Sequence, residues 1–473
     1  MSATQVKLNG MYTALGFALG AINVLILYPR VFSQETYGII SFVLASATLL
    51  FPLISLGMQQ TVLKFYDGRD VTKRHQTING SLQLMSLFAL LSMIGVLAFG
   101  DRIAESLSKQ NKVEVETVYI LTVLGVLMAY FELFFAFSKV QFKTSLGVFL
   151  KEVFPRLGVL LLLCSHFTLF QLSLNTFLFF AGLIYLARAL FMGIMAFKRT
   201  PFTLLSSAPI TSYFRLLTYS GLVLLGSVLS MAFIEIDKVM LHLYSSSSEV
   251  ALYTVFVFMA TTVAIPMRAI QPLYNAQCAA FQLQEKKEAL TLLVQQAISM
   301  SSHFGVLIVG ILLAASPVLH FFLPEDYHEA FRIFPVLLFL KFIDSSFSPI
   351  NSLFYYSGHY KAYLGYSLGF LFAMIVLNVF LIPGYGMIGA AWATTIAVVL
   401  FAVIKVMLSA SLLGVLTLHR DHWLPLLYLA LILGIALLVP ERFESAAQIA
   451  FALFMAFSFW KRKVFSGRFL EDS

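Results

Sequence analysis

The chain has 473 residues, of which 60% are hydrophobic and only 11% are charged, and its mean hydropathy is +0.88. Soluble globular chains are about one quarter charged, so this composition excludes a water-soluble fold. The formal net charge of +8 would suggest nucleic acid in a soluble protein. In a membrane protein the positive charge has to be interpreted from how Lys and Arg are divided between the loops on the two sides of the membrane. No nucleic-acid partner is expected.

Apolar runs separated by Gly, Pro and charged residues divide the chain into about fourteen segments, each long enough to span a bilayer with roughly 20 residues. The first seven are predicted at 8–29, 38–63, 79–100, 116–138, 147–168, 171–197 and 211–236. The others are predicted at 249–272, 289–315, 328–349, 360–382, 387–411, 422–440 and 443–460. Short loops join them, which predicts an all-α polytopic membrane protein. Two distant cysteines give no disulfide or metal spacing, and no cofactor is expected.

The Lys and Arg residues are divided unevenly between the two sets of loops. With the N-terminus inside, 22 lie on the inside, seven lie outside, and Arg188 and Lys341 lie within helices, which accounts for all 31. Cytoplasmic loops retain an excess of positive charge. Both termini are therefore expected in the cytoplasm.

A weak internal repeat links the two halves. A shift of 214 positions places Glu35 on Glu249 and Pro52 on Pro266. Because six helices is an even number, the second copy enters from the same side, which predicts two parallel six-helix bundles around a central cavity. The expected parts are residues 1–200, residues 201–412, and residues 413–473 with two extra helices and a cytoplasmic tail. This architecture is typical of a transporter.

Ionisable residues inside apolar segments are the candidates for a site, because an unpaired charge in hydrocarbon costs several kcal/mol or more. Arg188 lies in the sixth predicted helix, where it would bind phosphate oxygens, pair with Glu132 or extend to the interface. Arg156, in the fifth, would either contact substrate or anchor the helix together with Lys151. Glu132, among aromatic residues in the fourth, would couple an ion if burial raised its pKa.

Four further candidates lie nearer the helix ends or in the second half. Lys341 and Asp344 are three residues apart on one helix face, so they would neutralise each other, or Lys341 would meet phosphate while Asp344 takes H+ or Na+. Asp237 is expected to close the seventh helix, as an ion-coupling or gating residue or as part of a pairing that fixes the next turn. Arg30, at the outer end of the first helix, would anchor the interface or contact substrate.

One segment carries a resemblance to a known family. Residues 377–395 read LNVFLIPGYGMIGAAWATT, which resembles the helix 11 to helix 12 signature of the Wzx-type polysaccharide flippases. In this segment Pro383 and Gly384 are expected to end a helix, and Gly386 and Gly389 to allow a tight turn. Similar segments lie at 33–45, 236–256 and 323–338.

The family is the polysaccharide exporter branch of the multidrug/oligosaccharidyl-lipid/polysaccharide exporter superfamily. The resemblance implies a flippase, not an enzyme, in a bacterial cytoplasmic (inner) membrane. It would move an undecaprenyl-pyrophosphate-linked oligosaccharide from the cytoplasmic to the periplasmic leaflet by alternating access, for lipopolysaccharide O-antigen or exopolysaccharide. Membrane lipid, H+ or Na+, a polysaccharide polymerase and a chain-length regulator are the other expected partners. The acidic residue Asp237 and the arginine Arg156 resemble residues frequent in this family.

Three alternatives remain open at this point. A multidrug or ion antiporter shares the superfamily fold but typically lacks the last two helices. A peptidoglycan-precursor flippase has the same number of helices. A polysaccharide polymerase or ligase handles the same lipid, but such enzymes generally carry a long periplasmic loop, and every outer loop here has about 15 residues or fewer.

Overall fold

The computed structural model describes residues 3–141, 144–168, 171–198, 210–357, 359–419 and 422–438. Within these ranges the chain is built of helices joined by short connections, and ten of the helices are long and apolar enough to cross a membrane. This confirms the all-α membrane fold. The predicted last helix, at 443–460, lies outside the described residues.

The chain divides into two compact units, Met1–Thr254 and Val255–Ser473. The three-part division expected from the sequence stays a prediction. The helices of the first unit are α1 (Ala3–Ala21), η1 (Ile22–Leu27), α2 (Tyr28–Val31), α3 (Gln34–Ser55), α4 (Met58–Phe65), α5 (Val71–Leu107), α6 (Val115–Lys139), α7 (Ser145–Val148), η2 (Phe149–Val153), α8 (Phe154–Thr168), α9 (Leu174–Phe197) and α10 (Ile210–Tyr244). The next helix, α11 (Ser247–Ala260), crosses the boundary between the units.

The second unit contains the remaining helices. They are η3 (Thr261–Ala264), α12 (Ile265–Leu283), α13 (Lys287–Ala314), α14 (Ser316–Phe322), η4 (Glu325–Ile333), α15 (Phe334–Phe347), α16 (Pro349–Tyr356), α17 (Tyr360–Leu413) and α18 (Trp423–Leu438). Here α15 packs between α13 and α17, and α12, α13 and α16 share an apolar core.

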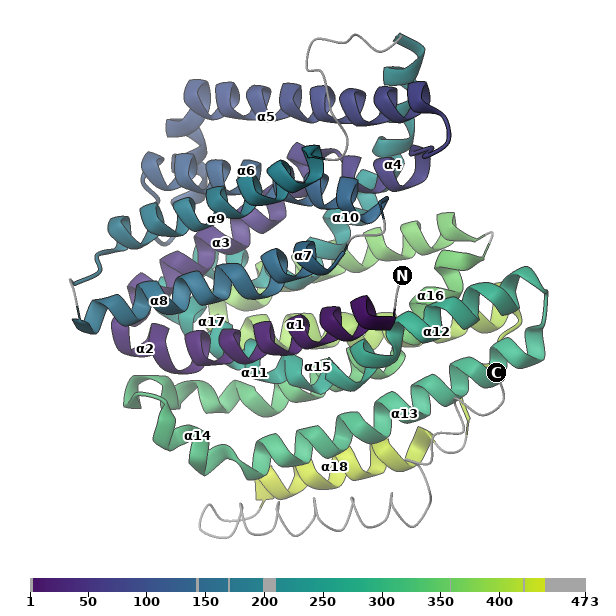
Figure 1. Cartoon of the computed structure of the whole chain (residues 1–473). Coiled ribbons are helices and arrows are strands. Elements are labelled where there is room, and N and C mark those ends of the chain that lie inside the picture. The colour runs from purple at the N-terminus through teal and green to yellow at the C-terminus, as the bar shows by residue number, and fades with distance from the viewer. Residues whose placement is uncertain are drawn as a thin grey trace. The chain divides into compact units, whose positions relative to one another are not determined.

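Helix α6 is the centre of the first unit. It packs against α3, α4, α5 and α9, and Figure 1 shows α5 and α9 running beside it. Its side chains Phe131, Leu133 and Phe137 are fully buried. A helix that is apolar on all sides and surrounded by others suits the interior of a membrane bundle. This central position explains why Glu132, in the second half of α6, faces a neighbouring helix and not lipid.

The predicted second helix, 38–63, is wrong as a single element, because the chain breaks between α3 and α4. Leu56 and Gly57 both have positive φ, 49° and 66°. A left-handed residue cannot continue a right-handed helix, and glycine accepts this conformation at least cost. The break directs α4 and the following loop towards α5 and α10.

Asp70 begins the long helix α5. Its side chain accepts a hydrogen bond from the backbone N–H of Lys73 at 3.0 Å, the usual arrangement of an N-cap. This hydrogen bond lowers the pKa of Asp70 below its ordinary value, so the cap is ionised at pH 7.

Helix α17 is in fact a hairpin of two helices, as the sequence predicted. The Tyr366 hydroxyl donates to the backbone oxygen of Phe401 at 3.1 Å, whereas 35 residues of straight helix would separate them by about 52 Å. The reversal occurs at Gly386, with φ 54° and ψ −132°. Gly389 then packs so closely that a Cβ would lie 2.3 Å from the Leu381 oxygen. The small residues of the signature therefore form the tight turn.

Gly386→Ala is expected to destabilise the protein by about 1–3 kcal/mol, because its φ and ψ are accessible essentially to glycine alone. The matched control is Gly384→Ala, two residues earlier, where an added Cβ would meet nothing within 4 Å. The measurement is the thermal unfolding midpoint of the purified proteins in detergent. Equal midpoints for the two variants would contradict the assigned turn.

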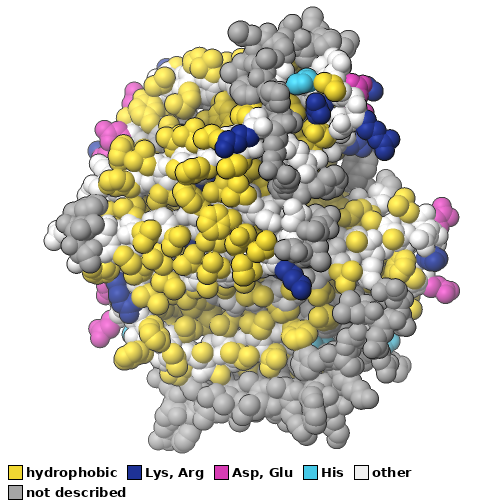
Figure 2. Space-filling model, viewed as in Figure 1, with side chains coloured by type: hydrophobic (Ala, Val, Ile, Leu, Met, Phe, Trp, Pro, Cys, Tyr) yellow, Lys and Arg dark blue, Asp and Glu magenta, His cyan; other side chains and the backbone are white. Residues whose placement is uncertain are grey.

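The surface carries the large apolar side chains that lipid requires. Examples with more than half of their surface exposed are Leu97, Phe372 and Phe380. In Figure 2 hydrophobic side chains far outnumber charged ones on the face in view. A soluble monomer rarely exposes such an area, whereas hydrocarbon solvates it at no cost.

Candidate functional site

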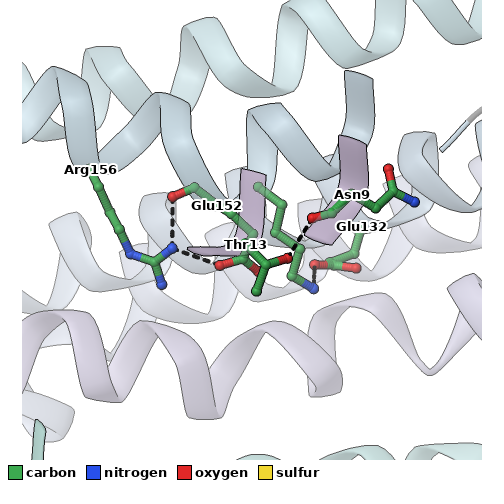
Figure 3. Close-up of polar contacts among 6 residues, drawn as sticks. Asn9, Thr13, Glu132, Glu152 and Arg156 are labelled. Atoms are coloured by element: carbon green, nitrogen blue, oxygen red, sulfur yellow. Dashed lines mark hydrogen bonds and ion pairs between the residues drawn. The ribbon is translucent and has the colours of Figure 1, made fainter. Parts of the chain in front are cut away.

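The candidate site lies in the first unit, where α6 and the following helices form an antiparallel hairpin. The chain leaves α6 at Lys139 and returns through α7 and η2, so residues equally far from the turn lie at the same level. Lys151 on η2 accordingly places its Nζ 2.6 Å from Glu132 Oε1 on α6 (Figure 3). Only 15% of the Glu132 side chain is exposed. The carboxylate is therefore neutralised by Lys151.

A π-helical turn, η2, carries both Lys151 and Glu152. Such turns are rare and frequently occur at functional sites. Helix α1 approaches this turn closely at Gly16, where a Cβ would lie 2.5 Å from the Glu152 oxygen. Arg156, just beyond the turn, donates from Nη1 to Glu152 Oε2 at 2.6 Å and to the Glu152 backbone oxygen at 2.7 Å (Figure 3). Its guanidinium is thus fixed on the side of η2 next to α1.

Arg188 projects from α9 into the interior of the first unit and is only 7% exposed. Its guanidinium carbon lies 4.1 Å from the ring centroid of Phe131 and 4.7 Å from that of Tyr185. Within the described part of the chain it forms no ion pair, and its Nε has no hydrogen-bond acceptor. The pairing with Glu132 considered from the sequence is not formed, because Lys151 occupies that carboxylate. Arg188 therefore keeps planar N–H donors available for an anion.

We call Glu132, Lys139, Lys151, Glu152, Arg156 and Arg188 the basic cluster. Electrostatic interactions connect Glu132 with Lys151, Lys139 and Arg188, and Arg188 with Glu152 and Arg156. Four cations against two carboxylates leave a formal charge of +2. A net positive charge inside an apolar bundle is costly unless an anion binds there.

A double-mutant cycle tests the pair at the centre of this cluster. Lys151→Met and Glu132→Gln are each expected to lower the free energy of unfolding, because each single change leaves the other charge unpaired. The double variant should lose less free energy of unfolding than the sum of the two single losses. Lys151 is 43% exposed, so the coupling energy should be only about 1 kcal/mol. Thermal unfolding of the four purified proteins measures it. Strict additivity would show that the two charges do not interact.

Asp237 lies within α10 rather than at its end, because the helix continues to Tyr244. The expectation that Asp237 closes the seventh helix is therefore wrong. The residue is 7% exposed, and its Oδ2 accepts a hydrogen bond from the Tyr253 hydroxyl at 2.8 Å. The neighbouring Lys238 pairs with Glu235 at 2.7 Å. Asp237 thus joins α10 to α11 within the first unit, which matches the structural interpretation of this residue.

Arg30 lies at the end of α2 and is exposed, with its Nη1 donating to the Ile26 backbone oxygen at 3.1 Å. The charged groups that act on Arg188 do not include Arg30. A role as an interface anchor fits this position.

Lys341 and Asp344 both lie on α15 in the second unit and do not pair with each other. Asp344 is exposed, and its charge acts on Lys405 and Tyr366 of α17. Lys405 is 7% exposed and forms no ion pair among the described residues. The structure therefore places Asp344 against a buried lysine of the neighbouring helix, in a unit that does not contain Arg188.

Sequence reasoning named Glu132 and Lys151 separately but missed their pairing, and it did not name Lys405 or Glu152 as site residues. Residues 141–142 lie midway between Glu132 and Lys151 in the sequence. The turn predicted between the fourth and fifth helices could therefore have identified these two residues as a pair. Lys405 follows an apolar run and was counted as a loop-end charge, although the same rule that singled out Arg188 applies to it. Glu152 lies four residues before Arg156, and this i,i+4 spacing could have identified the ion pair from the sequence.

The described residues contain no group of three His, Cys, Asp or Glu side chains placed to hold a metal ion. Cys164 and Cys278 form no disulfide with each other.

Comparisons with known proteins agree with this architecture. Residues 8–273, more than half of the chain, match the family model described as "Polysaccharide biosynthesis protein". No curated protein matches. The fold is similar to a solved "Lipid II flippase MurJ, inward closed conformation", with a TM-score of 0.76 and 13% identity over 96% of this chain and 97% of that one.

A second solved structure is an inward-facing multidrug resistance MATE family transporter of the MOP superfamily. It matches with a TM-score of 0.67 and 15% identity over 87% of this chain and 98% of that chain. At these identities the likeness establishes the fold, and the family match establishes the relationship. The chain belongs to the polysaccharide biosynthesis protein family and has the fold of MOP-superfamily transporters.

Proposed function

We propose that this protein is a flippase that moves an undecaprenyl-pyrophosphate-linked oligosaccharide from the cytoplasmic to the periplasmic leaflet of a bacterial inner membrane. It does so by alternating access, for the biosynthesis of a surface polysaccharide such as O-antigen or exopolysaccharide. Both termini are cytoplasmic in this proposal, as the division of Lys and Arg between loops predicts.

The observation that carries the proposal is the basic cluster with its buried, unpaired Arg188. A pyrophosphate needs cationic partners throughout its passage, because transfer of an uncompensated anion into hydrocarbon is prohibitive. A planar guanidinium binds phosphate oxygens through two parallel hydrogen bonds, which an ammonium cannot do. Arg188, Arg156 and Lys151 therefore supply the chemistry expected of a diphosphate site.

The described charges also suggest roles for the acidic candidates. Glu132 is held by Lys151 and would regulate the charge of the cluster, while Asp237 would maintain the junction of α10 and α11. Asp344, together with Lys341 on the same helix, is the proposed site for H+ or Na+ in the second unit. A polymerase and a chain-length regulator are proposed partners, because a translocated repeat unit must be polymerised before export.

The test is the surface polysaccharide and the polyprenyl-linked sugar pool in a strain that lacks this chain. We expect the polymer to disappear and the lipid-linked oligosaccharide to accumulate on the cytoplasmic side, with the wild-type gene restoring both. Intact polymer with reduced resistance to cationic drugs would instead identify a multidrug antiporter. Arrest of cell-wall synthesis would identify a peptidoglycan-precursor flippase, and accumulation of single repeat units on the periplasmic side would identify a polymerase or ligase.

A further inference from the structure

We propose that the first unit carries a second anion site, next to the basic cluster and sharing Lys139 with it, that captures the diphosphate group of the substrate at the cytoplasmic end of the bundle. The site is a hollow where the end of α4, the loop to α5, the end of α6 and the start of α10 meet. We call it the basic pocket. This inference rests on the proposed function, since it concerns the entry of the same lipid-linked substrate.

The basic pocket has a volume of about 920 Å³, within the usual range of about 300–1,000 Å³ for ligand sites. Its cationic lining residues are Lys64, Arg69, Lys73, Lys139 and Arg215. Asp67 is the one acidic side chain in the same described lining, so the formal charge is +4. This volume accommodates two linked phosphates together with the first sugar. Electrostatics therefore favour an anion of at least two charges.

The one carboxylate of the basic pocket is engaged within its own loop. Asp67 Oδ1 accepts hydrogen bonds from the backbone N–H groups of Arg69 at 2.9 Å and Asp70 at 3.4 Å. It forms no ion pair with the pocket cations in the part of the chain described here. Among those cations Lys73 alone has such a partner, Asp70, at 3.4 Å on the exposed surface. The other four cations are therefore available to an incoming anion.

Aromatic rings position three of these cations through cation–π contacts, which leave the N–H groups able to donate hydrogen bonds to a ligand. Lys64 lies over Tyr219 with its Nζ 5.7 Å from the ring centroid, and Arg215 lies over Phe65 at 5.0 Å. Lys139 lies over Phe135 at 4.1 Å. A cation held by a ring face keeps its hydrogen-bonding groups directed elsewhere, unlike one held by a carboxylate. The pocket is thus preorganised for phosphate oxygens.

The positive-inside rule explains why each of these cations lies near a cytoplasmic helix end, but it does not require them to converge. The residues come from three chain segments, 64–73, 139 and 215, that are far apart in sequence and line one hollow. Topology alone would be satisfied by cations dispersed around the bundle. Their concentration beside a single engaged carboxylate favours a ligand.

Lys139 connects the basic pocket with the basic cluster. It lines the pocket, and its charge interacts with Glu132 and Lys151 of the cluster. A diphosphate bound in the pocket would therefore meet the next cations without crossing an uncompensated apolar region. We therefore assign capture of the substrate diphosphate to the basic pocket and its passage through the bundle to the basic cluster with Arg188.

The binding experiment uses the full-length protein in lipid nanodiscs and inorganic pyrophosphate as the probe. The pocket variant combines Lys64→Gln, Arg69→Gln and Arg215→Gln, and the control combines Arg102→Gln, Lys112→Gln and Arg332→Gln, three exposed cations outside both sites. The pocket variant should bind pyrophosphate at least tenfold more weakly, because several charge-assisted hydrogen bonds are lost. Unchanged affinity would overturn the proposal. The single change Arg69→Gln, at an exposed loop residue, repeats the test if the triple variant fails to fold.

Competition by lipids identifies the source of the phosphate. Undecaprenyl diphosphate in the nanodisc should displace pyrophosphate from wild-type protein, and undecaprenyl monophosphate should do so at least tenfold less well. Equal displacement by phosphatidylglycerol would mean that the pocket binds any anionic lipid headgroup, which contradicts the proposal. Failure of undecaprenyl diphosphate to compete would assign the pocket to a free phosphate compound and would equally overturn it.

Export measurements separate failure of this site from failure of the proposed function. We expect the pocket variant to require more substrate for half-maximal export, while Arg188→Met lowers the export rate at least tenfold at any substrate level. If Arg188→Met lowers export in this way and the pocket variant exports and binds as wild type does, the flippase function stands and the basic pocket is excluded. If deletion of the whole chain leaves polysaccharide export intact, the proposed function itself falls.

Discussion

Replacing Arg188 with methionine is expected to lower export of the surface polysaccharide at least tenfold while the protein remains folded in the membrane. Loss of a charge-assisted contact to phosphate costs about 1.5–3 kcal/mol, which corresponds to roughly a ten- to hundredfold lower rate of translocation. The unfolding midpoint should not fall, because methionine fills the space between Phe131 and Tyr185 and removes a buried charge that has no ionic partner.

The matched change Arg188→Lys keeps the charge but not the planar fork of donors. We expect it to restore part of the export, since an ammonium binds phosphate as a point charge only. The measurement is the amount of surface polymer and of lipid-linked oligosaccharide in the deletion strain that expresses each variant at equal protein level. Full export by Arg188→Met would show that the buried guanidinium has a structural role alone.

Gly38→Ala is expected to prevent stable folding of the first unit. Gly38 lies in the first turns of α3, where a Cβ would lie 1.6 Å from the Ser247 oxygen and 2.4 Å from the Ser247 carbonyl carbon. Ser247 has little freedom to move away, because Asn111 Oδ1 accepts its backbone N–H at 3.2 Å and Asn111 Nδ2 donates to the Ser245 oxygen at 2.8 Å. Overpacking against fixed backbone costs about 3 kcal/mol or more.

The control for this change is Gly95→Ala in α5, where an added Cβ would meet nothing within 4 Å. That substitution should be neutral or stabilising by up to about 1 kcal/mol, because alanine favours a helix interior. The measurement is the yield of monodisperse protein in mild detergent and its thermal midpoint. Equal yields for Gly38→Ala and wild type would contradict the close approach of α3 to Ser247.

The sequence alone determined the membrane class, most helix positions and the hairpin at Gly386. Partition into lipid depends on the apolar character of each continuous segment, so these elements can be recognised one at a time. The turn could also be recognised from the sequence, because the residues that form it, Pro383, Gly384 and Gly386, lie within a few positions of one another. The break at Leu56–Gly57 was missed because an almost uninterrupted apolar run hides two consecutive left-handed residues.

Only the tertiary structure decided which charges share a site. Arg188 was recognised from its isolation in an apolar helix, but only the structure shows that Glu132 forms its ion pair with Lys151, which the hairpin delivers to that carboxylate, and not with Arg188. The basic pocket unites cations as distant as Lys64 and Arg215, which the sequence shows only as separate loop charges. The interaction between two charges depends on the distance between them in space. Sequence periodicity relates residues within one helix, whereas the packing of helices sets the distances between charges on different helices.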